Sequence, residues 1–256
     1  MEDISKFQLD LLLQERDSHI SNKNIGAVEW ESDDVEYSNK YFSDCIFSGT
    51  AIKGLKFIDC YFRNCHFKKC VLRGIQCFST EFDSCTFGED QQTGSEFYFS
   101  SLISCDIHCC KFRYVKFNFC DLYNIEDHNS DYSYTLWKSC HFGKKISEKK
   151  TLYRARFSGS KLVGAYMPSM IFDNCEFFNV DFSQSNLDYI SAEDAKMLDC
   201  KLTNVSTTAA KFSRADISGS NISGFDIRQL DNYDSMLISE EQLDSLITAL
   251  DIIIGH

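Results

Sequence analysis

A repeat of five residues is the feature that most constrains what this chain can fold into. Cut into fives from Cys45, the sequence reads CIFSG TAIKG LKFID CYFRN CHFKK CVLRG, and the same frame returns later as AKFSR ADISG SNISG. From Phe42 to Ile227, 32 of the 38 central positions carry Phe, Leu, Ile, Met, Tyr or Trp. Such a short internal period is typical of solenoids, in which each repeat packs only against its neighbours.

The length of the repeat restricts the geometry further. Neither the 3.6-residue period of a helix nor the two-residue period of a strand gives a repeat of five. A square coil does, if each block forms one side and the chain turns sharply at each corner. The large central residue and the small residue two positions before it then point inward. Stacked at about 4.8 Å per turn, the blocks predict an all-β solenoid of about nine coils.

The small inward position accounts for most of the 13 cysteines. We interpret them as apolar core residues, not as disulfides or metal ligands, and expect Cys45, Cys65, Cys85 and Cys105 to stack in one column. The cysteines at this position are Cys45, Cys60, Cys65, Cys70, Cys85, Cys105, Cys110, Cys120, Cys140, Cys175 and Cys200. An odd number of thiols without paired zinc spacing suits a reducing compartment, so we expect a cytoplasmic protein without a cofactor.

The formal charge of −12 comes from the two ends of the chain. Residues 1–40 carry 10 acidic and 4 basic residues, and residues 230–256 carry 6 acidic and no basic ones. The middle, residues 41–229, balances at 22 against 22. Any acidic binding surface on the coil must therefore lie in a local patch.

Polar residues occupy inward positions in three stretches. A buried polar group without a partner is costly, so we expect residues 88–94, 126–131 and 143–150 to leave the coil as loops, with a distorted coil as the alternative. Loops on a rigid scaffold are natural contact sites. The third is rich in lysine, which we interpret as solvated and not as a nucleic-acid site. The predicted partner-binding loop residues are Glu89, Asp90, Gln91, Asp127, His128, Asn129, Lys144, Lys145 and Lys149.

An outward position carries Phe99 and, one coil later, Phe119. The two rings should stack on one side wall, with Tyr114 nearby. A monomer has little reason to expose such an aromatic patch. We interpret Phe99, Phe119 and Tyr114 as a partner-binding wall, the alternative being that a neighbouring loop covers it.

Residues 1–34 do not follow the repeat and predict a partly helical N-terminal extension. A solenoid must cover its terminal coils, since these otherwise expose core and unpaired strand edges. Ile4, Phe7, Leu11 and Leu12 form one apolar stripe of a short helix that could lie across the first coil.

The predicted β-helix spans residues 35–229, and residues 230–256 form a second predicted cap at its C-terminal end. Ser239 and Gln242 stand at the spacing of a capping box, and an apolar stripe and a short strand follow. We expect this segment to cap the last coil and to form a dimer. The predicted dimer interface is Leu243, Leu246, Ile247, Leu250, Ile252 and Ile254.

The blocks of five resemble the pentapeptide-repeat family, whose pattern is a small residue, a polar residue, Leu or Phe, and two variable polar residues. The resemblance covers about three quarters of the chain and implies a right-handed quadrilateral β-helix. The run DIRQLDNYDSMLISEEQLDSLITALDIIIG at residues 226–255 is similar to the C-terminal segment of the quinolone-resistance pentapeptide proteins. That similarity implies a homodimer and a rod that imitates duplex DNA to bind DNA gyrase or topoisomerase IV.

The sequence does not predict an enzyme. Among the six histidines only His128 falls in a predicted loop beside a carboxylate, Asp127, and adjacent residues of an extended segment point apart. Two hypotheses remain for a protein that binds a protein partner: topoisomerase protection by DNA mimicry, and a general interaction scaffold with no topoisomerase role. The neutral coil and the aromatic wall support the scaffold. The mimic is supported by local acidic positions, namely Asp188, Glu193, Asp194 and Asp199.

Overall fold

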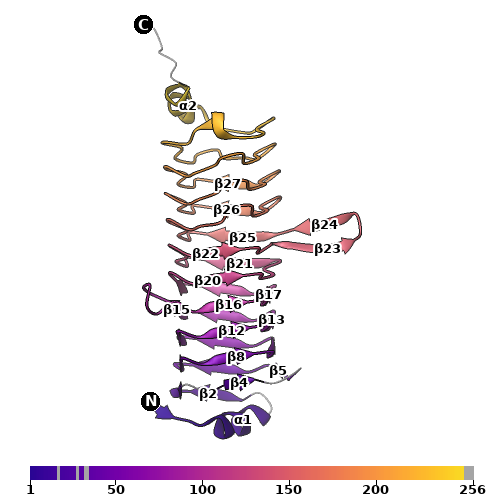
Figure 1. Ribbon diagram of the computed structural model, residues 1–256, viewed down its shortest axis with the longest axis vertical. Coiled ribbons are helices and arrows are strands. Elements are labelled where there is room, and N and C mark those ends of the chain that lie inside the picture. The colour runs from indigo at the N-terminus through magenta and orange to yellow at the C-terminus, as the bar shows by residue number, and fades with distance from the viewer. Residues whose placement is uncertain (16–17, 27–28, 32–34, 251–256) are drawn as a thin grey trace.

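A four-sided coil makes up most of the molecule, and each of its sides stacks into a parallel sheet (Figure 1). The computed structural model describes residues 1–15, 18–26, 29–31 and 35–250. The chain visits the four sides in turn, so sides 1 and 3 lie opposite each other, as do sides 2 and 4. The longest sheet has nine strands, and the predicted β-solenoid of about nine coils is confirmed.

The strands are short and are grouped here by side. Side 1 contains β2 (His19–Ser21), β6 (Tyr41–Ser43), β10 (Tyr61–Arg63), β14 (Glu81–Asp83), β18 (Asp106–His108), β21 (Ile125–His128), β25 (Ala155–Ser158), β26 (Glu176–Phe178) and β27 (Lys196–Leu198). Side 2 contains β1 (Glu2–Asp3), β3 (Lys23–Gly26), β7 (Ile46–Ser48), β11 (His66–Lys68), β15 (Thr86–Gly88) and β19 (Lys111–Phe112). Side 3 contains β4 (Glu29–Glu31), β8 (Ala51–Lys53), β12 (Val71–Arg73), β16 (Glu96–Tyr98), β20 (Lys116–Asn118) and β22 (Leu136–Lys138). Side 4 contains β5 (Glu36–Ser38), β9 (Lys56–Ile58), β13 (Gln76–Phe78) and β17 (Ser101–Ile103).

Beyond these strands, the later coils continue each side through single parallel bridges, such as Leu136 with Tyr166 on side 3. The remaining elements are the hairpin β23 (Gly143–Ser147) and β24 (Lys150–Tyr153), the helices α1 (Lys6–Gln14) and α2 (Leu243–Ala249), and the 3-10 turns η1 (Ile227–Gln229) and η2 (Glu240–Gln242).

Central residues of successive coils lie directly over one another and form the core. Phe42 pairs with Phe62, and Phe62 with Phe82, so their rings stack with centroids 4.6 and 5.1 Å apart. These distances follow from the spacing of parallel strands, about 4.8 Å. All three rings are buried. The repeat therefore produces continuous columns of aromatic side chains.

The corners explain how a chain with one proline turns so often. The second residue after most centres adopts a left-handed backbone, as at Asn64 (φ 50°) and Ser84 (φ 55°). Its N–H donates to a carbonyl of the next coil: Asn64 N to Asp83 O and Ser84 N to His108 O, both 2.8 Å. These hydrogen bonds offset the strain that left-handed geometry imposes on residues other than glycine.

Cysteine packing confirms the predicted core role. All 13 thiols are free and all but Cys109 are buried. Ten of the thiols donate to a carbonyl of the preceding coil, as Cys85 Sγ does to Phe62 O at 3.3 Å. The column that begins Cys45, Cys65, Cys85 continues to Cys110 and not, as predicted, to Cys105, because a loop adds one block to that turn.

Two of the three predicted departures from the coil are confirmed. After β15, residues 89–93 loop out at the corner between sides 2 and 3. Gly88 and Gly94 bracket this loop, and a Cβ on either would lie within 2.5 Å of the backbone of the next coil. The second departure is the antiparallel hairpin β23–β24, which projects from the corner between sides 4 and 1 (Figure 1).

The third predicted loop, residues 126–131, is wrong. β21 stays in the coil and pairs in register with β18 and β25. Asp127 points inward and is fully buried, where it accepts hydrogen bonds from Tyr132 Oη at 2.9 Å and from Ser160 Oγ. The inward carboxylate is therefore satisfied by partners inside the core and has no need to leave it.

The N-terminal helix α1 is confirmed as a cap. It begins with a capping box formed by Ser5 and Gln8, and it buries Leu9 and Leu13 in the same apolar cluster as the first coil. The extension is thus partly helical, as predicted.

The buried face of α1 differs from the predicted stripe. Phe7 and Leu11 are exposed, at 72% and 47%, although Ile4 is buried and Leu12 packs partly against the core. β1 fixes the rotation of the helix, because Ile4 N donates to Asn24 O at 3.1 Å. That hydrogen bond turns Leu9 and Leu13 inward instead.

The coil begins before residue 35, the boundary expected from the sequence. Strands β2 to β5 already form a turn, with Ile20 paired to Phe42 and Tyr37 paired to Phe57. In the sequence, Ile20 and Phe42 are two residues farther apart than Tyr37 and Phe57 are. Ile20 and Trp30 therefore fall out of phase with the later centres, which hides this turn in the sequence.

At the C-terminus the predicted capping box is present, and Gln242 closes the last coil. Its buried amide donates to Ile217 O at 2.9 Å and to Ser220 O at 2.8 Å. Leu246, the buried residue of α2, packs in the core cluster. These contacts satisfy carbonyls that the end of the coil would otherwise leave unpaired.

The buried carboxylate predicts a pH-dependent stability. Burial raises the pKa of Asp127 to about 6, against hydrogen bonds from Ser160, Ser130 and Tyr132 that lower it. The folded state therefore holds a proton that the unfolded state loses near pH 4. Stability falls as the pH rises from about 4 to about 6, by up to about 3 kcal/mol.

Asp127→Asn mimics the protonated acid and removes the loss of stability that occurs as the pH rises. We expect the variant to unfold at a higher temperature than the parent above pH 6 and at the same temperature near pH 4, as measured by circular dichroism across that range. Asp106→Asn, which changes an exposed carboxylate of the same side, is the control. A difference between Asp127→Asn and the parent that does not vary with pH would contradict the assignment.

Candidate protein-binding faces

Side 1 carries a concentration of outward carboxylates. Glu81, Asp106 and Glu126 occupy consecutive rungs in register, so they form a column on one side of the rod. The outward acidic residues of this side are Glu81, Asp83, Asp106, Glu126, Glu176 and Asp216. We call this surface the acidic face.

Cations compensate the acidic face unevenly. Arg156 and Lys196 both pair with Glu176, at 2.6 and 3.2 Å, and the hydrogen bond from Arg156 lowers the pKa of that carboxyl. In the described ranges, no ion pair reaches Glu81 or Asp106. Uncompensated negative charge therefore gathers around the middle rungs of this face.

Side 3, on the opposite side of the rod, is apolar and basic. Outside the hairpin, every exposed large hydrophobic residue between residues 42 and 227 lies on this side or on its two edges. They are Val71, Phe99, Phe119, Tyr134, Tyr166 and Tyr189. We call this surface the aromatic face.

The stacking predicted for Phe99 and Phe119 is present in the structure. Phe99 and Phe119 stack at 4.9 Å on the edge between sides 3 and 4, and they are 56% and 44% exposed, so no described loop covers them. Tyr114 is half-buried and lies on the other edge, between sides 2 and 3, where it stacks on Tyr134 at 5.1 Å. Two aromatic ladders therefore border side 3.

Cations line the aromatic face. The Arg73 guanidinium lies 5.8 Å from the Phe99 ring centre, and Lys138 Nζ lies 6.0 Å from that of Phe119. Arg113 lies over Tyr114 and Tyr134 at 5.8 and 5.9 Å. The outward basic residues of side 3 from residue 51 onward are Lys53, Arg73, Lys116 and Lys138, against Glu96 and Asp188.

The acidic positions singled out in the sequence do not form one patch. Asp188 lies on side 3 and Glu193 on side 4, while Asp194 and Asp199 occupy different corners. Arg214 pairs with Glu193 at 3.4 Å and with Asp194 at 2.8 Å. The acidic face is made of other residues, which the sequence reasoning missed because it did not assign residues to sides.

The loop after β15 holds three predicted contact residues, Glu89, Asp90 and Gln91, all of them exposed. Asp90 Oδ1 accepts from the backbone of Gln92 and Thr93 at 2.8 and 2.9 Å, and these hydrogen bonds lower the pKa of its carboxyl. The loop is therefore an internally bonded acidic projection.

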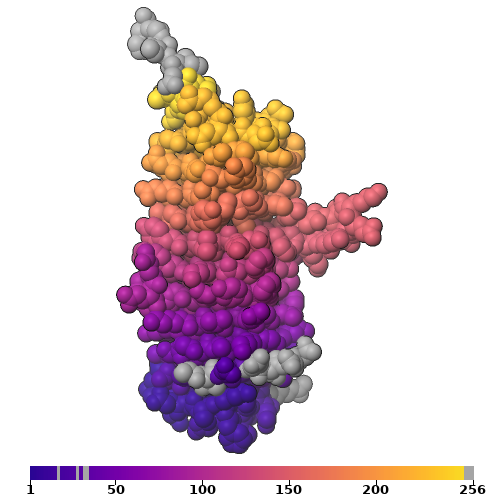
Figure 2. All heavy atoms as spheres, in the orientation of Figure 1, coloured from indigo at the N-terminus to yellow at the C-terminus, as the bar shows by residue number. Residues whose placement is uncertain are grey.

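The hairpin presents the predicted lysines Lys144, Lys145 and Lys149 to solvent, beside the acidic face (Figure 2). Residues 127–129 lie in the coil instead. His128 points outward and stacks on His108 at 5.1 Å, and Asn129 forms a corner at φ 58°. Asp127 and His128 thus face opposite sides of the backbone and do not form a catalytic pair.

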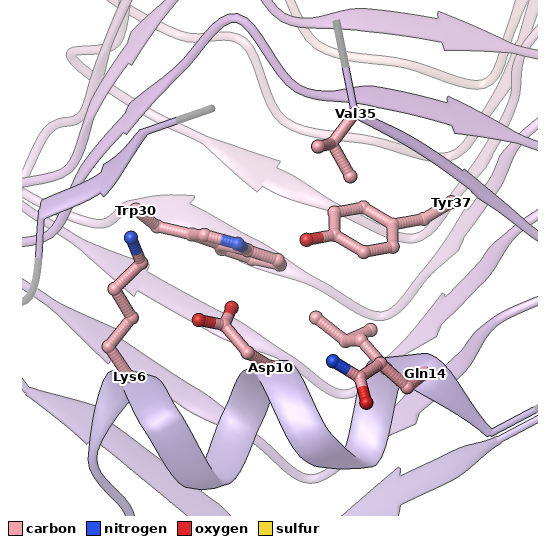
Figure 3. Close-up of a pocket in the computed structure, with 7 residues that line it drawn as sticks. Lys6, Asp10, Gln14, Trp30, Val35 and Tyr37 are labelled. Carbon is pink, nitrogen blue, oxygen red and sulfur yellow. The ribbon is translucent and has the colours of Figure 1, made fainter. Parts of the chain in front are cut away.

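A cavity of about 300 Å³ lies between α1 and the first coil (Figure 3). Asp10 reaches from the helix toward Trp30, and the Tyr37 hydroxyl points the same way. Burial raises the pKa of Tyr37. The remaining lining residues are Lys6, Leu13, Gln14 and Val35. This cavity was not predictable from the sequence, because the first turn does not follow the repeat.

The predicted dimer residues are divided by their exposure. Leu243 and Leu250 are exposed, at 47% and 40%, whereas Leu246 is buried against the last coil and Ile247 is half-buried. Ile252 and Ile254 lie outside the described residues. An apolar surface therefore remains at the C-terminal end of the rod.

The described residues include neither a metal-binding cluster nor a membrane-spanning helix. They contain no group of three His, Cys, Asp or Glu side chains placed to hold a metal ion. None of their helices is long and apolar enough to cross a membrane.

Comparisons with known proteins agree with this geometry. A search of curated protein sequences gives no match. The family described as pentapeptide repeats matches residues 152–188 in 8 copies.

The structure is similar to full-length QnrB1, described as a plasmid-mediated fluoroquinolone resistance protein, with a TM-score of 0.67, 20% identity, and coverage of 83% of this chain and 100% of that one. Two trypsin-treated, substituted forms of QnrB1 give TM-scores of 0.64 and 0.54 at 19% and 16% identity. They cover 84% and 93% of this chain and 100% and 97% of theirs. Identities this low bear on the fold alone. Residues 152–188 match the pentapeptide-repeat family, and the five-residue frame of that match runs from Phe42 to Ile227.

Proposed function

We propose that this protein is a non-enzymatic binding protein of the cytoplasm that protects a type II topoisomerase, DNA gyrase or topoisomerase IV, by presenting its acidic face in place of DNA. The observation that carries the proposal is the column of Glu81, Asp106 and Glu126 on consecutive rungs. One carboxylate every 4.8 Å or so approaches the phosphate density of a DNA strand, about one per 3.4 Å. A basic DNA-binding groove would attract such a column.

Segregation of charge reconciles this role with a neutral coil. The lysines and arginines that balance the total lie largely on other sides, including Arg73, Lys116 and Lys138 on side 3. A partner that approaches Glu81 and Asp106 on side 1 is separated from the cations of side 3 by the width of the rod. The similarity to QnrB1, a fluoroquinolone resistance protein, supports the same proposal.

Dimerisation through the C-terminal end is part of the proposal. Leu243 and Leu250 are exposed next to the capped coil, and exposed leucines at the end of a rod favour burial against a second copy. A dimer would double the length of acidic surface offered to a topoisomerase.

A supercoiling assay with purified gyrase and ciprofloxacin tests the function. We expect the protein to restore supercoiling in the presence of the drug. The combined variant Glu81→Gln, Asp106→Asn, Glu126→Gln should need about tenfold more protein for the same effect, since it removes the charge that draws the enzyme. Asp131→Asn, Asp181→Asn, Glu193→Gln removes three carboxylates from sides 2 and 4 and should act like the parent.

If the parent neither inhibits nor rescues supercoiling at any concentration, the topoisomerase proposal fails. If both triple variants lose the effect equally, the acidic face is not the contact surface and only net charge matters.

Removal of the loop after β15 tests its part in protection. Deletion of residues 89–93 joins Gly88 to Gly94 and restores a turn of four blocks, so the coil should keep its melting temperature to within a few degrees. We expect rescue from ciprofloxacin to weaken about tenfold, because the acidic projection is lost. The Gln92→Ala variant retains the backbone and charge of the loop and is the control. Full rescue by the deletion variant would remove the loop from the mechanism.

The dimer is tested at exposed positions, since substitution of buried Leu246 would also damage the cap. We expect the parent to elute as a dimer in size-exclusion chromatography with light scattering, and the Leu243→Asp, Leu250→Asp variant to elute as a monomer with an unchanged circular dichroism spectrum. Phe7→Asp, a similar change at the other end, should leave the dimer intact. A monomeric parent would overturn this part of the proposal.

A further inference from the structure

We propose that the aromatic face is a second docking surface and that it binds an acidic, partly apolar segment of a partner protein. This surface lies across the rod from the acidic face. The inference concerns a different partner contact and does not depend on topoisomerase binding.

The first argument is the distribution of exposed apolar residues. If outward residues were distributed at random, the exposed apolar side chains would be spread over all four sides of the coil. Here Val71, Phe99, Phe119, Tyr166 and Tyr189 all lie on side 3 or on the edge it shares with side 4, and Tyr134 lies on its other edge. Contiguous exposed apolar surface of this kind marks sites of protein interaction.

The second argument is the use of phenylalanine at two corners where the preceding coils have glycine. Phe99 and Phe119 occupy corner positions with φ of 49° and 56°, whereas the two preceding coils place Gly54 and Gly74 at the same edge. Left-handed geometry disfavours a side chain by roughly 1 kcal/mol or more. Since about half of each ring is exposed, packing within the chain recovers only part of this penalty. The corner hydrogen bonds from Phe99 N to Asn118 O and from Phe119 N to Lys138 O offset this strain, but glycine would form them equally well. The corners therefore do not require the two exposed rings, and residues retained at such positions are candidates for function.

Charge identifies the chemistry of the partner. Arg73 and Lys138 lie against the two phenylalanine rings and make no ion pair within the part of the chain that the structure describes. On the same side of the rod Lys116 does have a partner, since its Nζ lies 2.5 Å from a Glu96 carboxylate oxygen. The edges of aromatic rings are electropositive, as are the two cations. Carboxylates interspersed with apolar side chains complement this surface.

Stacking geometry argues against single-stranded nucleic acid as the occupant. Bases bind protein aromatics through a free ring face. Phe99 and Phe119 cover each other's inner faces at 4.9 Å with an interplanar angle of 10°. Arg73 and Lys138 lie over the rings at 5.8 and 6.0 Å. The rings therefore offer mainly their edges, which suit carboxylates better than bases.

The test uses fluorescence anisotropy with a fluorescein-labelled peptide of repeating Glu-Leu-Asp-Phe as the probe, and an oligothymidylate of equal charge as the competing ligand class. We expect the full-length protein to bind the peptide more tightly than the oligonucleotide, and added salt to weaken the binding. Phe99→Gly, Phe119→Gly should weaken it about tenfold while keeping the melting temperature, because glycine suits the left-handed corners. Arg73→Gln, Lys138→Gln should weaken it similarly and reduce the salt dependence.

Lys68→Gln, Lys161→Gln removes two exposed lysines from side 2 and is the matched control, expected to bind as the parent does. Tighter binding of the oligonucleotide would overturn the proposal, as would peptide affinity unchanged by the phenylalanine variant. Self-association in sedimentation that Phe99→Gly, Phe119→Gly abolishes would assign the face to a second copy and overturn it too. The acidic-face triple variant should bind the peptide normally, so this result and the supercoiling result can fail separately.

Discussion

The hydrogen bond from each corner to the next coil is the interaction on which the rest of the structure depends. It holds a left-handed residue in place every five positions and sets the distance between rungs, as Asn64 and Ser84 illustrate. Once that distance is fixed, side chains of one kind must stack, which gives the columns of Phe42, Phe62 and Phe82. The same geometry acts outside the coil, where like charges and aromatic rings are also placed in register.

Much of the fold follows from the sequence because the repeat fixes which residues point inward. The core phenylalanines, the buried cysteines and both caps were predictable from period and capping signals alone. Asp127 was not, because its burial depends on Tyr132 and Ser160, which reach it from neighbouring blocks. A sign existed: the small inward position changes from cysteine to Ser130, Thr135 and Ser160 around that carboxylate.

The candidate surfaces were harder to predict than the core. A five-residue frame separates inward from outward residues, but it does not say which of four sides an outward residue occupies. The loop after β15 adds one block and the hairpin adds more, so each changes the side on which later residues fall. Phe99 and Phe119 were placed correctly because no insertion separates them. Tyr114 was misplaced because neighbouring blocks lie on different sides.

Opposite charges on sides 1 and 3 give the rod a transverse dipole moment, directed across its long axis. A highly charged partner would exert a torque on such a molecule before contact, and would turn the complementary side toward itself at distances up to a Debye length, about 8 Å at physiological ionic strength. Orientation during approach shortens the search for the productive encounter. Two oppositely charged sides of one solenoid can thereby bind partners of opposite charge without a change of shape.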